Sequence, residues 1–541
     1  MMNEAECVIT FQPCGVSVTA RVNELLSDAA QRAGVKINRH CGGVGTCGKC
    51  RVRATGDGSF LAPLTETEKK LLSPDDIAEG VRLACCAPVR GSGEVYVIDG
   101  MTLSNDKILE SVSDEKISHW SPDAGGYGVA VDIGTTTVVC YLLDLDKHVK
   151  IDTFSFLNPQ VAFGDDVISR IAFSASAGGG GLMRLQAVLV DEMNNALDTL
   201  AKRNGIGKTD IREVMVAGNT VMEHIFLGVS PESIGHSPYK PVFLEHAPVP
   251  ANDIGLEVAF AAVVRLLPNV AGYVGGDIVA GVAASGMDKH PGMKLFIDIG
   301  TNNEIAIGNR DVMFCCATAA GPAFEGARIQ YGMRASLGAI ETVRLEDSGL
   351  VCGTIGDVPP KGLCGSGLID AVALMLCAGV IDERGRLQSR EECKDERFSR
   401  RIGRDRNGML RLLLTDTKNP VYLTQKDIRE VQLALGAVKA GTDIMLDSVG
   451  ICLDDLDEVL LAGAFGNNID VRSATIVGLL PKVRRDRIRS VHNSSGLGAC
   501  MSLASSEFYE NAHVTAKRMS YVELSSRKDF EKRFISNMIF S

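Results

Sequence analysis

The stretch that decides the first domain of this chain is HCGGVGTCGKC, residues 40–50. Three cysteines lie in it at C-x5-C-x2-C spacing, namely Cys41, Cys47 and Cys50. A fourth thiol follows in the run RLACC, where Cys85 and Cys86 are both candidates. The glycines between the cysteines let the backbone wrap closely around a group and point its N–H donors inward. The spacing therefore predicts three close thiolates and one remote thiolate around a common centre.

Three neighbouring thiolates and a remote fourth are the arrangement that holds a [2Fe-2S] cluster. The spacing resembles the adrenodoxin and putidaredoxin branch of the ferredoxins, because the plant-type spacing is C-x4-C-x2-C. This resemblance implies Cys85 as the fourth ligand, since the ligand of that branch follows a short Arg-Leu-Ala-like run, and Cys86 stays the alternative. A structural zinc site is a second alternative, but such sites usually show two C-x2-C pairs and this region offers one.

The other thiols bear on the cellular compartment. The chain contains 16 cysteines, and its first residues, MMNEAECVIT, lack the basic start and long apolar core of a signal peptide. We therefore expect a cytoplasmic protein without disulfides, in which most of the remaining cysteines are buried and reduced.

Length and charge limit the other possibilities. A chain of 541 residues is too long for one core and predicts three or four domains. The formal net charge of -11 argues against a nucleic-acid partner, which would need a basic face. No apolar run approaches the roughly 18 residues that a membrane helix needs, so we expect no membrane contact.

The pattern of apolar residues predicts an N-terminal domain over residues 1–98. Strands are expected at 7–11, 16–22, 51–54 and 94–98, and helices at 66–72 and at 23–33, where Asn23 is the expected N-cap. This order of elements resembles the β-grasp ferredoxin fold. The polar segment 99–126, with the only tryptophan, is predicted as a linker that gives the redox domain reach, although a merely polar spacer fits equally well.

An internal repeat dominates the rest of the chain. The run GVAVDIGTTTVVCYLLDLD at 128–146 is a strand, a Gly-Thr turn and a second strand, and the pattern returns as MKLFIDIGTNNEIAIG at 293–308. In each copy an aspartate, Asp132 or Asp298, ends an apolar strand. A glycine then opens the turn and polar residues follow it, namely Gly134 with Thr135, Thr136 and Thr137, and Gly300 with Thr301, Asn302 and Asn303.

Each copy has the chemistry of a phosphate loop. The N–H groups and side chains of such a turn can hold phosphate oxygens, and the two aspartates are predicted to face Mg²⁺ through water, because Mg²⁺ keeps most of its hydration. A single Asp-x-Gly-Thr could be an ordinary hairpin turn. Two copies, each between two strands, make a hairpin by chance an unlikely explanation and predict Asp132 and Asp298 as catalytic residues.

Two such loops across a cleft resemble the phosphate motifs of the actin, sugar kinase and heat-shock-chaperone ATPase superfamily. That fold implies a third loop for the adenosine of ATP, and the strand and turn at 457–466 supply it with Gly463, Ala464, Phe465 and Gly466. The run Gly365-Ser366-Gly367 at a helix start is a second candidate for anion binding, and a packing turn is its alternative explanation. The expected division is a middle domain at 127–205 and a large domain at 206–541.

Three helices are predicted in these domains. Apolar residues between Leu182 and Leu200 fall on one helical face, which we assign to the core. Residues 214–228 are predicted to form a strand, a turn and a helix, and His224 on this helix is interpreted as a structural histidine. A long amphipathic helix is expected over 424–447, starting at Thr424.

The chain as a whole resembles the reductive activators of corrinoid enzymes. The resemblance rests on motifs in a fixed order: HCGGxGxCGKC, DIGTTTV, NPQxxFGxDVISRI, AGNTxM, VGGD, DIGTNNE, AGPAFEGA, CGSGLID, TQKDIREVQLA and LAGAFGNN. It implies a multidomain α/β protein with a β-grasp [2Fe-2S] ferredoxin domain and a duplicated actin-like, RNase H-like ATPase fold. Methanogen-type activators carry further C-x2-C clusters near the C-terminus, and this chain has none there.

The resemblance also implies the function. Such activators pass one electron from the [2Fe-2S] cluster to a corrinoid protein whose Co(I) has been oxidised to Co(II), and they use ATP and Mg²⁺ because the transfer is uphill. It implies as partners a corrinoid protein of a methyltransferase system, a low-potential electron donor such as a reductase, flavodoxin or ferredoxin, and a second copy in a homodimer. The alternatives are an activator of a radical or dehydratase enzyme, a sugar kinase with a redox sensor, and a protein that forms actin-like filaments.

Overall fold

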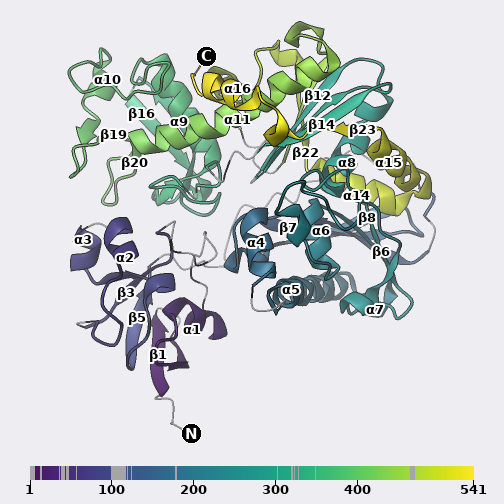
Figure 1. Cartoon of the computed structure of the whole chain (residues 1–541), viewed down its shortest axis with the longest axis horizontal. Coiled ribbons are helices and arrows are strands. Elements are labelled where there is room, and N and C mark those ends of the chain that lie inside the picture. The colour runs from purple at the N-terminus through teal and green to yellow at the C-terminus, as the bar shows by residue number, and fades with distance from the viewer. Residues whose placement is uncertain are drawn as a thin grey trace. The chain divides into compact units, whose positions relative to one another are not determined.

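The computed structural model of the chain describes residues 6–540 except 13–14, 34, 36, 38–42, 44, 46–47, 57, 73, 99–116, 118–119, 123–124, 177–179, 301, 319–320, 322, 327, 348 and 464–468. Figure 1 shows the helices and strands of the chain, which divides into two compact units. The first contains residues 1–104 and 159–188, and the second contains residues 105–158 and 189–541. Among the described residues, no helix is long and apolar enough to cross a membrane.

The first unit is built on a five-stranded sheet with the order β2-β1-β5-β3-β4. Its strands are β1 (Glu6–Gln12), β2 (Val16–Arg21), β3 (Arg51–Ala54), β4 (Val81–Leu83) and β5 (Gly93–Val97). β1 and β5 are parallel, and the other neighbours are antiparallel. This mixed sheet, with a helix after the first hairpin, confirms the predicted β-grasp ferredoxin fold.

Short helices complete this sheet, and one predicted cap is wrong. The helices are α1 (Leu26–Arg32), α2 (Glu66–Leu71) and α3 (Pro74–Ala78), with a 3-10 turn over Ala84–Cys86. α1 begins three residues later than expected, and its N-cap is Leu25 rather than Asn23. Asn23 instead adopts a left-handed backbone with a φ of 71°, and its N–H donates to the carbonyl of Val89 at 2.8 Å. Asparagine tolerates this conformation better than most residues, which makes it a turn residue here.

The second unit contains two six-stranded sheets. The first has the order β10-β11-β9-β6-β7-β8, and its strands are β6 (Tyr127–Ile133), β7 (Thr137–Asp144), β8 (Val149–Leu157), β9 (Ile211–Gly218), β10 (Val249–Pro250) and β11 (Val263–Leu266). β6, β7 and β8 form an antiparallel meander, and β9 and β11 add to β6 in parallel. This sheet therefore combines strands from the predicted middle domain, residues 127–205, with strands from the predicted large domain, residues 206–541.

The second sheet repeats this topology. It has the order β22-β21-β12-β13-β14-β23, with β12 (Lys294–Ile299), β13 (Asn303–Gly308), β14 (Met313–Thr318), β21 (Glu458–Ala462), β22 (Ile488–His492) and β23 (Met519–Tyr521). β12, β13 and β14 form the antiparallel meander, and β21 and β22 add to β12 in parallel. The repeat seen in the sequence is thus a repeat of the fold, as predicted.

Helices cover both sheets. α8 (Gly276–Ala284) and α14 (Ser494–Ala504) share one hydrophobic core with residues of both six-stranded sheets. α9 (Gly365–Cys377), α11 (Gln425–Val449) and α13 (Val471–Val477) share a second core with β12, β13 and β21. The other helices are α4 (Val167–Ser174), α5 (Gly180–Asn204), α6 (Thr220–Phe226), α7 (Ala251–Ile254), α10 (Glu396–Ser399), α15 (Ser506–Arg518) and α16 (Phe530–Asn537).

Two small sheets complete the second unit. One contains β15 (Ala339–Glu346), β16 (Gly349–Thr354) and β17 (Gly362–Leu363), and the other contains β18 (Ile402–Arg404), β19 (Leu410–Leu413) and β20 (Tyr422–Thr424). β17 leads directly into α9, and β20 leads directly into α11. These two helices are therefore fixed at their N-terminal ends by strand pairing.

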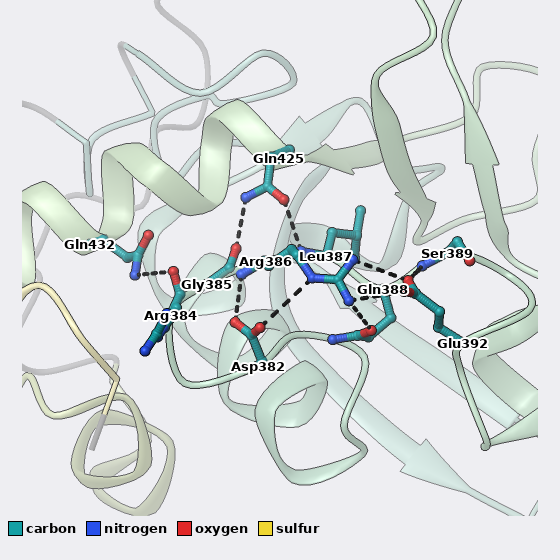
Figure 2. A network of polar contacts seen from close by, with 10 residues as sticks. All are labelled: Asp382, Arg384, Gly385, Arg386, Leu387, Gln388, Ser389, Glu392, Gln425 and Gln432. Atoms are coloured by element: carbon teal, nitrogen blue, oxygen red, sulfur yellow. Dashed lines mark hydrogen bonds and ion pairs between the residues drawn. The ribbon is translucent and has the colours of Figure 1, made fainter.

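α11 begins where the sequence predicts. Thr424 is its N-cap, and the side chains of Thr424 and Asp427 form a capping box. Figure 2 shows how the first turns of this helix hold the loop that follows α9. The Gln425 side chain donates to the carbonyl of Gly385 at 2.7 Å and accepts from the N–H of Leu387 at 2.8 Å. Gln432 donates to the carbonyl of Arg384 at 3.1 Å, so both glutamines tie the loop to the helix.

His224 is a structural histidine, as the sequence suggests. It is fully buried on α6, and its ring stacks on Phe243 with 4.0 Å between the ring centroids. Its Nε2 accepts from the N–H of Val242 at 3.1 Å, and its Nδ1 lies 2.7 Å from the carbonyl of Thr220. Burial lowers the pKa of this imidazole to about 4, so the ring is neutral.

The end of the predicted linker packs on the second unit. The Trp120 ring stacks on His148 with 5.2 Å between centroids. The N–H of Ser121 donates to the carbonyl of Ala504 at 2.8 Å, and the hydroxyl of Ser506 donates to the carbonyl of Ser121 at 2.9 Å. Residues 99–116 of the predicted linker lie outside the described residues.

Candidate nucleotide cavity and cluster site

A cavity of about 290 Å³ in the second unit brings the two halves of the repeat together. Its lining includes nine of the residues predicted to bind nucleotide or act in catalysis: Asp132, Gly134, Thr135, Thr136, Thr137, Asp298, Gly300, Asn302 and Gly463. Asp298 and Gly463 meet because the parallel strands β12 and β21 end at the same edge of one sheet, and the loop that contains Asp132 comes from the other six-stranded sheet. The predicted residues Thr301, Ala464, Phe465 and Gly466 lie outside the described residues.

Asn303 is placed differently from its neighbours. It is fully buried and does not line the cavity, whereas Asn302 and Glu304 do. Successive side chains of a strand point to opposite faces, so Asn303 faces away from the side that Asn302 and Glu304 share. Neither atom of its side-chain amide has a hydrogen-bond partner among the described residues. A contact between Asn303 and nucleotide stays a prediction.

The first aspartate is held by the N-terminus of α14. The Asp132 carboxylate accepts from the side chain of Asn493 at 2.9 Å and from the hydroxyl of Ser495 at 2.8 Å. Asn493 is the N-cap of α14, and its side-chain oxygen accepts from the N–H of Gly496 at 2.8 Å. Burial raises the pKa of Asp132, while the two hydrogen bonds oppose this rise. The carboxylate is thus fixed in position at the end of β6.

The first predicted phosphate loop needs its glycine. A Cβ on Gly134 would lie 2.5 Å from the carbonyl oxygen of Thr137, which is closer than van der Waals contact allows. The turn is also fixed from the end of β8, where the Asn158 side chain donates to the carbonyl of Gly134 at 2.9 Å. The N–H of Asn158 donates to the carbonyl of Thr136 at 2.8 Å. A tight, preorganised turn therefore follows Asp132.

The second aspartate lies beside the start of the predicted adenosine loop. β12 and β21 are parallel neighbours, and Asp298 pairs with Ala462. Gly463 has a φ of 88°, and a Cβ there would lie 2.5 Å from Asp298 Oδ1. Burial, and then the negative charge of Asp132, raise the pKa of Asp298 to about 7. Only glycine lets the backbone pass this close to the carboxylate.

The structure adds residues that the sequence analysis did not select as site residues. Asp277, at the start of α8, and Glu304, on β13, also line the cavity. Burial and the neighbouring carboxylates raise the pKa of both groups. The further polar lining residues are Asn219, Glu325, Arg334, Asn493, Ser494 and Ser495. Asp277 belongs to the VGGD run and Asn219 to the AGNT run, so both motifs marked the site without showing which side chains reach it.

The carboxylates repel one another but do not form a metal cage. Within the described part of the chain, no group of three or more Asp, Glu, His or Cys side chains is arranged to hold a metal ion alone. A divalent cation bound together with a phosphate would relieve the repulsion, since it favours the ionised form of nearby carboxylates. Mg²⁺ suits such a site because it keeps water ligands and needs only one or two carboxylates.

The N-terminus of α9 reaches the same cavity. Gly365 and Ser366 line it, together with Cys364 before the helix. Gly367 has a packing role, because a Cβ there would lie 2.3 Å from the carbonyl of Ile340. The Gly365-Ser366-Gly367 run therefore serves packing and also places a helix N-terminus at the cavity.

The thiols of the first unit converge as well. Cys50 Sγ lies 3.2 Å from Cys85 Sγ, and Cys85 Sγ lies 3.7 Å from Cys86 Sγ. The N–H of Ala84 donates to the carbonyl of Cys50 at 2.9 Å, which fixes the two segments together. Cys85 is buried and Cys86 is partly exposed. Cys41 and Cys47 lie outside the described residues.

A buried ion pair supports the segment before Cys85. Glu68 is fully buried and accepts from Arg82 through two contacts, at 2.8 and 3.0 Å. The same carboxylate accepts from the N–H of Leu83 at 3.0 Å. A bidentate pair with further hydrogen bonds is the arrangement in which burial of two charges is tolerated. It sets the position of β4 and so of the thiols that follow it.

A β-grasp domain with converging thiols, joined to a duplicated actin-like fold with a carboxylate-lined cavity, defines an iron–sulfur protein that carries an ATPase-type domain. Comparison with known families agrees. Residues 9–90 match the 2Fe-2S iron-sulfur cluster binding domain, residues 127–290 match the RACo middle region, and residues 292–541 match the C-terminal domain of RACo, the ASKHA domain. The chain belongs to the RACo family of reductive activators of corrinoid proteins.

Two relatives extend over most of the chain. The corrinoid activation enzyme RamQ of Eubacterium limosum is 31% identical over 95% of this chain and 96% of its own length. The [Co(II) methylated amine-specific corrinoid protein] reductase of Methanosarcina barkeri is 23% identical over 72% of each chain. The solved structure of a reductive activator for corrinoid, iron-sulfur protein has a TM-score of 0.70 and 31% identity, and it covers 99% of this chain and 98% of its own.

Proposed function

We propose that this protein is an ATP-dependent reductive activator, which passes one electron from its [2Fe-2S] cluster to the Co(II) corrinoid of a methyltransferase corrinoid protein and so restores Co(I). The observation that carries the proposal is the cavity in which Asp132 and Asp298, one from each copy of the repeat, meet in a chain that also brings Cys50 and Cys85 together. The relatives, which are named as activators or reductases of corrinoid proteins, support it.

The first unit would hold the cluster. The proposed ligands are Cys41, Cys47, Cys50 and Cys85. The sulfurs of Cys50 and Cys85 lie 3.2 Å apart, so a small separation of the two side chains would place both thiolates on one iron-sulfur group. A bound [2Fe-2S] cluster would supply the single electron. The packing of Ala84 on Cys50 and the Glu68–Arg82 pair would keep these two thiols in place whether or not the cluster is oxidised.

The cavity would bind Mg-ATP. The turns after Asp132 and Asp298 would hold phosphate oxygens through their N–H groups and the side chains of Thr135, Thr136, Thr137 and Asn302. The two aspartates would orient Mg²⁺ through water, in keeping with the lack of a three-ligand cage among the described residues. The adenosine would lie at the loop that begins at Gly463.

ATP has a defined task in this proposal. Reduction of Co(II) by a cluster of higher potential is unfavourable, so another process must offset its cost. A nucleotide can shift such an equilibrium only if it binds two conformations with different affinity. We expect closure of the cavity around Mg-ATP to favour the conformation of the activator–corrinoid complex in which the electron is transferred. The further partners would be a low-potential electron donor and a second copy of the chain.

The test is the visible spectrum of a Co(II) corrinoid protein mixed anaerobically with this protein and a chemical reductant, with and without Mg-ATP. Co(I) that appears only with Mg-ATP is the expected result. A cluster that is reduced normally, with ATP hydrolysis but no Co(I) from any candidate corrinoid protein, would contradict the corrinoid target. That outcome would favour an activator of a radical or dehydratase enzyme instead.

A further inference from the structure

The cavity has an unbalanced set of charges. Five carboxylates line it, from Asp132, Asp277, Asp298, Glu304 and Glu325. Among the described lining residues, Arg334 is the only one with a positively charged side chain. The phosphates of a nucleotide would add further negative charge to this site, and one Mg²⁺ ion compensates only part of it. A fixed positive charge at this position would therefore stabilise a bound anionic ligand.

The backbone around Arg334 is held firmly. The N–H of Met333 donates to the carbonyl of Leu363 at 3.0 Å, and the N–H of Leu363 donates to the carbonyl of Tyr331 at 2.8 Å. The hydroxyl of Ser336 donates to the carbonyl of Arg334 at 3.3 Å. These bonds attach the segment that carries Arg334 to β17, the strand that runs into α9. The arginine is thus placed by the same element that brings the helix N-terminus to the cavity.

The second positive contribution comes from α9. This helix has 13 residues, and its N-cap, Cys364, makes no side-chain cap hydrogen bond. The first N–H groups of a helix carry partial positive charge and attract anions. Gly365 and Ser366 at this end line the cavity together with Arg334. The Arg334 side chain and the N-terminus of α9 therefore both contribute positive charge to the lining of the cavity.

From this arrangement we infer that Arg334 binds a phosphate group of the nucleotide and so determines that the cavity takes phosphorylated nucleosides. The inference rests on the proposed function, which requires nucleotide in this cavity. Arginine suits the task because its planar guanidinium binds phosphate through two parallel N–H bonds and stays charged at all relevant pH values. The Nη1 atom of Arg334 is buried, so such a bond would be shielded from water.

The experiment compares Mg-ATP, Mg-ADP and adenosine by calorimetric titration of the full-length protein and its variants. Arg334→Gln should weaken binding of Mg-ATP by roughly 10- to 100-fold and leave binding of adenosine unchanged. Loss with Mg-ATP alone would place the contact on the terminal phosphate, and loss with Mg-ADP as well would place it on the inner phosphates. Arg334→Lys keeps the positive charge but not the planar guanidinium with its two parallel N–H donors. It should therefore lose less affinity for Mg-ATP than Arg334→Gln.

Arg328→Gln is the matched control. Arg328 lies six positions before Arg334 in the chain, outside the cavity lining, with a side chain 59% exposed and 3.7 Å from Glu430. It should bind all three ligands like the unchanged protein. Thermal unfolding by circular dichroism shows whether each variant is folded, and the lysine variant provides the test if the glutamine variant is not.

Two results would overturn the inference. Equal weakening of adenosine and Mg-ATP would show that Arg334 only supports the shape of the cavity. Unchanged affinity for all three ligands would show that it touches none of them. If the unchanged protein itself binds no nucleotide, the proposed function fails, and this result is distinct from the other two.

Discussion

The side-chain amide of Asn493 donates to Asp132 Oδ2 at 2.9 Å, across 361 positions of sequence. The same asparagine caps α14, because its side-chain oxygen accepts from the N–H of Gly496. One residue thus fixes both the start of a buried helix and a carboxylate that lines the cavity. The rotamer of Asp132 is therefore determined by α14 and not by its own loop.

Substitution of Asp132 or Asn493 should impair ATP-dependent formation of Co(I) without affecting assembly of the cluster. Asp132→Ala should abolish ATP-dependent formation of Co(I), while the visible spectrum of the cluster stays unchanged. Asn493→Ala should reduce the rate by roughly 10- to 100-fold, because a hydrogen bond to a charged group is worth about 1.5–3 kcal/mol. Asp191→Ala, at an exposed position of α5, is the control and should be fully active. Full activity of Asp132→Ala would remove this residue from the mechanism.

The pKa of Asp298 gives a pH dependence of stability. Burial and the charge of Asp132 raise this pKa from 3.8 to about 7, so the folded protein keeps a proton that the unfolded chain has lost. The stabilisation is full below about pH 4 and is lost as the pH rises to about 7. Without Mg²⁺, Asp298→Asn should therefore melt at the same temperature as the unchanged protein at low pH and at a higher temperature at pH 8.

Differential scanning calorimetry in EDTA from pH 4 to pH 8 measures this difference. A constant difference in Tm between the two proteins would contradict the raised pKa. Addition of Mg-ATP should bring the two melting curves at pH 8 closer together, because a cation stabilises the ionised carboxylate and has less effect on the amide.

The two adjacent thiols allow a direct test of the fourth ligand. Cys85→Ser should lose the visible absorption of the [2Fe-2S] cluster or change it strongly, because Cys85 is the buried thiol 3.2 Å from Cys50. Cys86→Ser should keep it. Cys452→Ser, at an exposed cysteine of the second unit, controls for general effects of the substitution. A cluster that survives in Cys85→Ser and is lost in Cys86→Ser would reverse the assignment.

Gly463 should not accept a side chain. Gly463→Ala should weaken Mg-ATP binding at least about 10-fold, because its Cβ would lie 2.5 Å from Asp298 Oδ1 in addition to the strain of its φ of 88°. Gly450→Ala is the matched control, since Gly450 has a φ of 71° but open space around it. It should lose about 1–2 kcal/mol of stability and keep its affinity for nucleotide. Equal affinities of the two variants, measured by titration, would contradict the close approach.

Local patterns predicted the elements of the fold well. β3 was expected over 51–54 and α11 from Thr424, and the structure has both, because the alternation of residues in β3 and the Thr424–Asp427 capping box of α11 can each be recognised from residues close together in sequence. The prediction of Asn23 as the N-cap of α1 was wrong because asparagine can serve either as a cap or as a left-handed turn residue. The choice depends on a distant backbone partner, the carbonyl of Val89.

The site was predicted only where the repeat marked it. Asp132 and Asp298 could be selected from the sequence because each is followed two residues later by a glycine in both copies of the repeat. Asp277 lies outside the repeat, and Glu304 lies in its second copy at a position where the first copy has Val138, so recurrence marks neither residue. Their raised pKa values arise from packing that a sequence does not display. Asn493 is a polar residue before a helix, and nothing near it in sequence indicates that the helix points at Asp132.

The two ends of α14 hold two different parts of the chain. Its N-cap holds Asp132, and at its C-terminus the carbonyl of Ala504 receives the N–H of Ser121. An α-helix of 11 residues is a stiff rod of roughly 16 Å. Ser121, near the end of the predicted linker, and the Asp132 carboxylate in the cavity are therefore held at opposite ends of one stiff helix. A truncated protein that starts at Tyr127 would keep α14 but lose the segment around Ser121 that is hydrogen-bonded to its C-terminus.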